Sequence, residues 1–115
     1  MKVYRWSEMA KEQMNASIAR QVIHSERMTV ARIHLSKGGL VPAHRHPSEQ
    51  MTMLERGRLR FTVEGESVVL QPGELLHIPS DALHHVEALE DSVAVDLFAP
   101  PREDWIRGED SYFRR

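Results

Sequence analysis

The sequence contains no cysteine among its 115 residues. Disulfide bonds and thiolate metal ligands are therefore excluded, and any metal ion must be held by histidine nitrogens and by oxygen atoms. The sequence also lacks an apolar run of about 18 residues, and no basic segment is followed by a short apolar one, so neither a membrane helix nor a secretory signal is indicated. We therefore expect a soluble, cytoplasmic protein.

An excess of charge of either sign is also missing. Fifteen Lys and Arg residues balance seventeen Asp and Glu residues, which gives a formal net charge of −2. This balance predicts no nucleic-acid partner and no membrane partner, because both need a basic surface. The 115 residues, of which 41% are hydrophobic, are enough to bury one core, so we predict a single domain over residues 1–115.

Histidine is the residue type that stands out, with seven in the chain. His44 and His46 form an H-x-H pair, and Gln50 follows four residues later. In an extended chain, residues of the same parity lie on one face, so these three side chains can converge on one point. Two imidazoles, an amide oxygen and one further donor would hold a divalent metal ion.

Polar and apolar residues alternate with a period of two along much of the chain. The segment RLRFTV at residues 58–63 alternates strictly, and turn signals such as EGE at 64–66 and QPGE at 71–74 separate the short segments. About eight or nine strands with regular turns are typical of an all-β sandwich or barrel. The weakly patterned first 16 residues allow a short helical turn, and residues 104–107 predict another.

Two segments resemble the two sequence motifs of the cupins. The spacing Gly38-x5-His44-x-His46-x3-Gln50-x6-Gly57 resembles the first motif, with Gln50 where glutamate is usual. Residues 65–84, GESVVLQPGELLHIPSDALH, resemble the second motif but lack the asparagine that often follows its histidine. The resemblance spans roughly residues 28–100. It implies a double-stranded β-helix, or jelly-roll barrel, with a metal ion inside it and with His84 as the fourth ligand.

The two adjacent histidines at 84 and 85 cannot both be ligands, because neighbouring residues of a strand face opposite ways. The spacing from Pro79 favours His84 over His85. The resulting ligand set, His44, His46, Gln50 and His84, is neutral, so a bound ion keeps its full charge as a Lewis acid. These ligand types accept Zn, Ni, Mn, Co or Fe and do not identify the metal.

Three features are similar to the small cupins of the KdgF type, which are pectin degradation proteins. They are Gln50, the segment IPSDALHH and the ending VDLFAPPREDW. The resemblance implies opening of 4,5-unsaturated uronates to the linear keto sugar acid, 4-deoxy-5-hexosulose uronate. It also implies functional roles for Asp96, Phe98 and Arg102, which stand at the spacing of that family. Small cupins commonly dimerise, so we expect a homodimer that binds a sugar acid.

The chemistry of the residues near the end of the predicted barrel supports a site independently of the family. Ala94, Asp96 and Phe98 share one face of the last predicted strand, where a carboxylate is costly to bury unless it is paired or used. Asp96 is therefore a candidate proton donor and acceptor, and the planar guanidinium of Arg102 suits a substrate carboxylate. The alternative is an ordinary salt bridge between Asp96 and Arg102.

Two other functions fit the same ligands. An Fe-dependent cupin dioxygenase would bind Fe(II) at the same four ligands and consume oxygen. A non-catalytic cupin would bind a metal or a sugar for sensing, or hold a metal only for stability. The sequence leaves these alternatives open beside the uronate enzyme.

Overall fold

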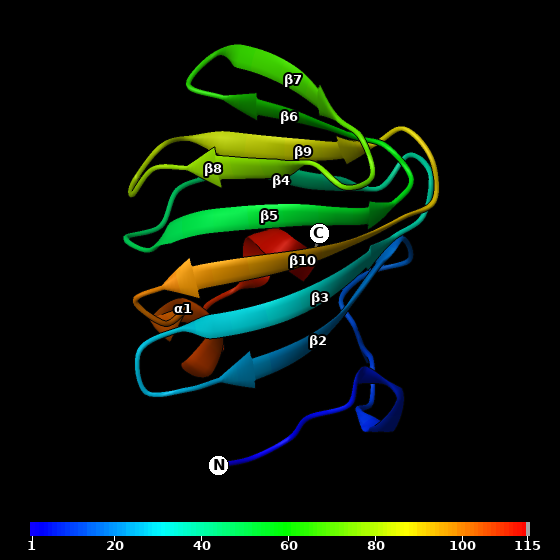
Figure 1. The fold of residues 1–115 in the computed structure, drawn as a ribbon. Helices are drawn as coiled ribbons and strands as arrows, with labels where there is room; N and C mark the ends of the chain where they lie inside the picture. The colour runs from blue at the N-terminus through cyan, green and yellow to red at the C-terminus, as the bar shows by residue number, and fades with distance from the viewer. Residues whose placement is uncertain (115) are drawn as a thin grey trace.

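The computed structural model describes residues 1–114 and contains ten strands within that range, arranged in two antiparallel sheets (Figure 1). One sheet has six strands in the order β1-β2-β3-β10-β5-β8, and the other has four in the order β4-β9-β6-β7. The strands are β1 Glu12–Gln13, β2 Ile18–His24, β3 Thr29–Leu35, β4 Leu40–His44, β5 Glu49–Arg56, β6 Leu59–Val63, β7 Glu66–Leu70, β8 Leu75–Ile78, β9 His84–Ala88 and β10 Ser92–Ala99. The all-β prediction is confirmed.

Helical structure in the described chain is confined to three short turns. A 3-10 turn, η1, covers Trp6–Glu8, which confirms the predicted N-terminal turn. A single α-helical turn, α1, covers Glu103–Ile106, and a second 3-10 turn, η2, covers Ser111–Arg114. Across residues 1–114, none of the helices has the length and apolar character needed to cross a membrane.

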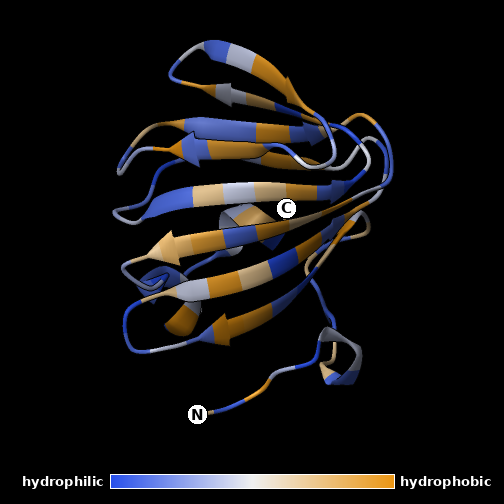
Figure 2. Cartoon of the chain, viewed as in Figure 1, coloured by the Kyte–Doolittle hydropathy of each residue, from blue (hydrophilic) through white to orange (hydrophobic). Residues whose placement is uncertain are grey.

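The alternating sequence pattern explains why the strands bury one face. Along β3, Ala31, Ile33 and Leu35 are buried while the residues between them are partly exposed. Figure 2 shows the same alternation of hydrophobic and hydrophilic residues along other strands. Two facing layers of such strands exclude water from the space between them, which is the main stabilising contribution to the fold.

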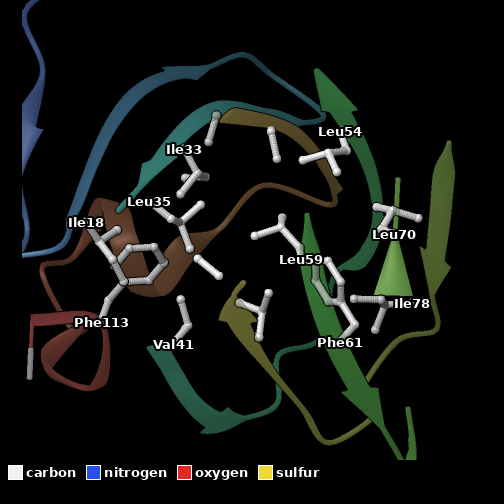
Figure 3. Packing of buried hydrophobic residues seen from close by; sticks show 14 of the residues in the cluster. Ile18, Ile33, Leu35, Val41, Leu54, Leu59, Phe61, Leu70, Ile78 and Phe113 are labelled. Atoms are coloured by element: carbon white, nitrogen blue, oxygen red, sulfur yellow. The ribbon is translucent and has the colours of Figure 1, made fainter. Parts of the chain in front are cut away.

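The core lies between the two sheets and includes residues from the end of the chain. Figure 3 shows side chains from both sheets and from η2 pointing into one cluster. Its labelled members are Ile18, Ile33, Leu35, Val41, Leu54, Leu59, Phe61, Leu70, Ile78 and Phe113. Ile18 belongs to β2, so the six-stranded sheet extends upstream of residue 28, where the sequence motifs place the start of the barrel.

The turn between β5 and β6 depends on Gly57. Its φ of +92° is in the left-handed region, and a Cβ atom there would lie 2.4 Å from the carbonyl oxygen of Asp91. A residue with a side chain would therefore be strained and would clash with the start of β10. This glycine lets the chain pass from β5 in one sheet to β6 in the other while it lies close to the start of β10.

One end of the barrel gathers the segments that carry the predicted site residues. The strand β4 ends there at His44, β9 begins there at His84, and β5 begins at Glu49. The strand β10 also ends there and leads into α1 (Figure 1). Residues that are far apart in the sequence are thereby brought to a common opening.

Candidate metal centre

Three histidines converge inside this end of the barrel. One ring nitrogen from each of His44, His46 and His84 lies within 4.8 Å of the others. His44 and His84 are direct partners in the antiparallel ladder of β4 and β9, and their ring centroids are 4.3 Å apart. His46 follows β4 and approaches from the loop before β5, with its centroid 5.0 Å from that of His84. His85 occupies the opposite face, where it pairs with Thr62 of β6.

Each of the three imidazoles is oriented by a local hydrogen bond from Nδ1. In every case Nδ1 lies 2.8 Å from a backbone carbonyl oxygen two residues away. The accepting residues are Pro42, Ser48 and Ala82. Because a carbonyl oxygen only accepts, Nδ1 must carry the hydrogen, and Nε2 is left with its lone pair. This arrangement is the one that holds histidine ligands in metal sites.

The electrostatics of the cluster favour the neutral, metal-binding form of the rings. Burial lowers the pKa of His44 to about 3, and a backbone hydrogen bond only partly opposes this effect. Burial, together with the positive charge of Arg102, lowers the pKa of His46 to about 4. The pKa of His84 is also lowered, mainly by burial. At neutral pH the three rings therefore carry no proton on Nε2 that a metal ion would have to displace.

Gln50 directs its amide oxygen at this cluster. Its Oε1 lies 3.2 Å from Nε2 of His46, and its Nε2 donates to Oγ1 of Thr52 over 2.9 Å. Thr52 in turn donates its only hydroxyl hydrogen to Oδ1 of Asp96 over 2.6 Å, so toward Gln50 it can only accept, and the amide group that faces it must be the NH2. This chain of donors fixes the direction of the Gln50 amide, which sequence spacing alone left undetermined.

The contact between His46 and Gln50 therefore brings two lone pairs together without a hydrogen between them. Nε2 of His46 is an acceptor because its Nδ1 donates to Ser48, and Oε1 of Gln50 is an acceptor by nature. Two acceptors at 3.2 Å repel each other unless a cation lies beside them. The residues present thus fit a divalent metal ion held by three imidazoles and one amide oxygen.

Asp96 lies next to the cluster on β10, between Ala31 of β3 and Thr52 of β5. Burial raises the pKa of Asp96 to about 6, although the Thr52 hydrogen bond and the charge of Arg102 act in the opposite direction. The residue keeps partial access to solvent. A carboxyl group with a pKa near neutrality is suited to take up and return a proton.

Arg102 is 2% exposed, and it does not form the salt bridge to Asp96 that was the predicted alternative. Its Nε and Nη2 donate to the two carboxylate oxygens of Asp104 over 3.0 and 2.8 Å, so no salt bridge to Asp96 is formed. The guanidinium carbon lies 4.7 Å from the ring centroid of Phe98 and 4.4 Å from that of Trp105. Phe98 also meets His46 edge to face, with centroids 5.5 Å apart, so this ring separates Arg102 from the histidines.

A cavity joins most of these groups. Its polar lining comes from His44, Gln50, Thr52, His84, Asp96 and Arg102, and its apolar lining includes Phe98 and Trp105. The cavity has a volume of about 40 Å³, which is room for roughly three water molecules, so a larger ligand must extend toward the barrel mouth. Six of the seven site residues predicted from the sequence line this cavity, and the seventh, His46, contacts three of them.

Sequence reasoning missed several residues of this region. Thr52 shares parity with Gln50 on β5, so its orientation toward the same face was available from the strand pattern. Asp104, Trp105 and Tyr112 lie after the last strand, where no periodic pattern indicated which way they face. Their positions against the barrel follow from the tertiary structure.

A two-sheet barrel with a histidine cluster at one end defines a class of protein. A family model described as a cupin domain matches residues 31–99. The chain therefore belongs to the cupin domain family, as the two motifs predicted.

Within that family, the chain is similar to proteins of pectin breakdown. It is 29% identical over 98 residues to the pectin degradation protein KdgF of Dickeya dadantii, a match that spans 83% of this chain and 89% of that protein. The solved structure of KdgF from Halomonas sp. is 26% identical, with a TM-score of 0.86 over 91% of this chain and 98% of that one.

A more distant solved structure shares the fold. The manganese-containing oxalate decarboxylase of Bacillus subtilis is 19% identical, with a TM-score of 0.74 over 84% of this chain and 29% of that one.

Proposed function

We propose that the protein binds a divalent metal ion through His44, His46, Gln50 and His84 and opens 4,5-unsaturated uronates to the linear keto sugar acid. The observation that carries the proposal is the chain from the ligand Gln50 through Thr52 to Asp96. It sets a carboxyl group suited to proton transfer directly beside a neutral metal-binding cluster. The similarity to KdgF proteins over most of the chain supports the choice of substrate.

The ligand set permits Zn, Ni, Mn, Co or Fe. When bound, such an ion supplies a Lewis acid for substrate hydroxyl, enol and carboxylate oxygens. The protein contributes orientation of the ligands through the three Nδ1 hydrogen bonds and an apolar surrounding that keeps electrostatic interactions strong.

Arg102 holds the carboxylate of the sugar acid in this proposal. Three of its five N–H groups are engaged, by Asp104 and Tyr112, whereas the two on Nη1 donate to no residue within the described chain. Arg102 lines the cavity, so these two donors are available to an anionic ligand. The rings of Phe98 and Trp105 meet edge to face, and both lie against the guanidinium, which limits its movement.

Asp96 carries the proton. As the bond between the anomeric carbon and the ring oxygen breaks, the anomeric hydroxyl gives its proton to Asp96 and becomes an aldehyde. The ring oxygen leaves as an enolate conjugated with the carboxylate, and the far carbon of the former double bond then takes a proton from Asp96. One proton leaves and one returns and no electrons are transferred, so the product is an isomer of the substrate.

The test follows the ultraviolet absorbance of the conjugated double bond of unsaturated galacturonate. We expect metal-loaded protein to accelerate its loss, and chelated protein to regain the activity when the metal is restored. Equal rates with and without loaded protein would contradict the proposal. Oxygen consumption by the iron-loaded protein with phenolic or diketone substrates would instead identify the dioxygenase alternative.

A further inference from the structure

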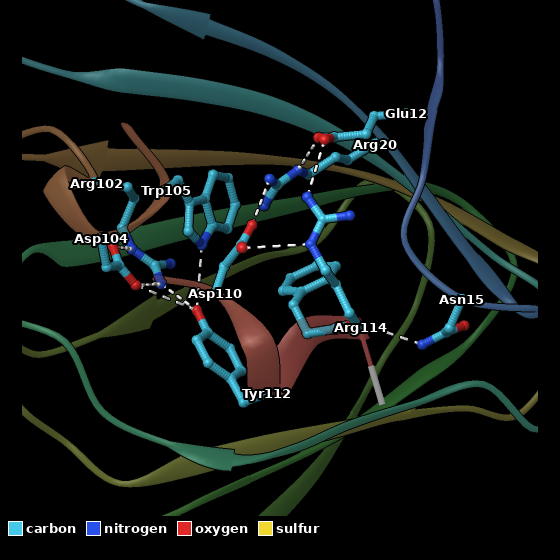
Figure 4. Close-up of polar contacts among 10 residues, drawn as sticks. Glu12, Asn15, Arg20, Arg102, Asp104, Trp105, Asp110, Tyr112 and Arg114 are labelled. Atoms are coloured by element: carbon cyan, nitrogen blue, oxygen red, sulfur yellow. Dashed lines mark hydrogen bonds and ion pairs between the residues drawn. The ribbon is translucent and has the colours of Figure 1, made fainter. Parts of the chain in front are cut away.

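The C-terminal turn η2 lies against the metal centre although it is outside the residues that match the cupin family. The ring of Tyr112 stacks on the imidazole of His44, with centroids 4.5 Å apart and planes 24° apart. Its hydroxyl group contacts Nη2 of Arg102 and lies 3.1 Å from Nε1 of Trp105 (Figure 4). One side chain therefore touches both a metal ligand and the arginine proposed to bind the substrate.

The hydrogen bonds of Tyr112 exclude a role as an acid or base. A phenol oxygen accepts two hydrogen bonds and donates one. Here it accepts from Arg102 and from Trp105, and it donates to Oδ2 of Asp104 over 3.4 Å. Burial also raises the pKa of Tyr112 above its ordinary value. No proton and no lone pair are left for a ligand, so the hydroxyl group can act only by holding its neighbours.

The turn that carries Tyr112 is firmly held. Asp110, 2% exposed, accepts from Nη2 of Arg20 over 2.6 Å, and Arg114 donates to Glu12 over 2.9 Å (Figure 4). Phe113, the next residue, is buried in the hydrophobic core. These contacts leave Tyr112 little freedom to move away from His44, as a positioning role requires.

We propose that Tyr112 is a positioning residue shared by the two halves of the site. Its ring holds the imidazole of His44 in the orientation for metal binding, and its hydroxyl holds the guanidinium of Arg102 with Nη1 toward the cavity. The second half of this inference rests on the proposed function, because it concerns the substrate carboxylate. The first half concerns metal binding alone.

Two substitutions separate the halves. Tyr112→Phe keeps the ring and removes only the hydroxyl, so we expect unchanged Zn²⁺ affinity and a KM for unsaturated galacturonate raised by about 10-fold with kcat little affected. Tyr112→Leu also removes the stacking ring, so we expect Zn²⁺ affinity to fall by about 10-fold or more in addition. Zn²⁺ affinity is measured by calorimetric titration of the chelated protein, and KM by the absorbance assay.

Tyr4 supplies the matched control because it is 49% exposed and is the other tyrosine of the chain. Tyr4→Phe and Tyr4→Leu should change neither constant. A Tyr112→Leu protein that melts at a lower temperature but binds Zn²⁺ like the wild type would overturn the first half and leave a purely structural residue. An unchanged KM in Tyr112→Phe would overturn the second half. Wild-type protein that binds Zn²⁺ but leaves the uronate intact would instead refute the proposed function and the second half with it, while the Zn²⁺ titrations would still decide the first.

Discussion

The site consists of two halves that are held in different ways. In the histidine half, each imidazole is oriented by a carbonyl oxygen two residues away in the sequence. In the arginine half, Asp104 is also two residues away, but the backbone N–H of Arg102 donates to Thr29, 73 residues away, and Nη2 contacts Tyr112 of η2. Contacts within one segment can form with that segment, whereas contacts between distant segments require the finished fold. The orientation of the histidines is therefore set within the barrel, and the arginine half also needs the C-terminal turn.

The largest expected effect is the loss of a ligand in the histidine half, because it would remove the metal ion and with it the proposed activity. We expect His84→Gln to weaken metal binding by more than about 100-fold, because losing a first ligand costs more than losing the groups that orient it. The matched control is His85→Gln, since His85 faces away from the cluster. Elemental analysis after dialysis measures the metal retained. Loss of metal in the His85 variant and not in the His84 variant would reverse the assignment.

The next prediction concerns Asp96, which lies between the two halves. Asp96→Asn keeps an oxygen that accepts from Thr52 but removes the proton carrier, so kcat should fall by about 10²- to 10⁴-fold while bound metal is unchanged. Asp91→Asn is the control, because Asp91 is exposed at the start of β10 and accepts from the backbone of Lys37. A normal kcat in the Asp96→Asn protein would rule out the proposed role of Asp96 in proton transfer.

A smaller effect is expected in the arginine half. Arg102→Lys keeps the charge but loses the planar fork, so KM for the sugar acid should rise by about 10- to 100-fold through lost charge-assisted hydrogen bonds. Arg107→Lys serves as the control, since Arg107 pairs with Glu109 on the surface. A rise in KM of equal size in both variants would show that Arg102 has no special relation to the substrate.

The contrast between the halves also explains what sequence reasoning could reach. His44, His46 and Gln50 converge as predicted, but not along the single extended strand that the parity argument assumed. His44 ends β4 of one sheet, His46 lies in the following loop, and Gln50 belongs to β5 of the other sheet. The cupin motif, and not periodicity, supplied His84. The alternation of β3 and β6 did predict which faces are buried, because local periodicity can be read from the sequence.

The remaining features depend on how the chain turns after β10. Asp96 and Asp104 are both close to Arg102 in the sequence, and the pairing with Asp104 depends on how α1 turns back to the barrel. The polar tail likewise gave no sign that Tyr112 stacks on His44. The homodimer and the cytoplasmic location stay predictions.

The smallest expected effect concerns the pH dependence of stability, which should change with substitutions in the histidine half and not with Tyr112→Phe. The lowered pKa values of His44 and His46, about 3 and about 4, mean that the folded rings stay neutral while the same rings in the unfolded chain take up protons below about 6.5. The unfolded state then binds more protons, so the free energy of unfolding of the chelated protein falls as pH falls from 6.5 toward 4. Each such histidine contributes a slope of about 1.4 kcal/mol per pH unit within that window.

Urea unfolding of the chelated protein at several pH values measures this slope. His44→Gln removes one group that cannot be protonated in the folded state, so its slope between pH 6 and pH 4.5 should be lower than that of the wild type by about 1.4 kcal/mol per pH unit. Tyr112→Phe keeps the ring that buries His44 and should retain the wild-type slope. An equal slope in wild type and His44→Gln would mean that the His44 imidazole is protonated in the folded chelated protein. A metal ion would then have to displace a proton from that ring.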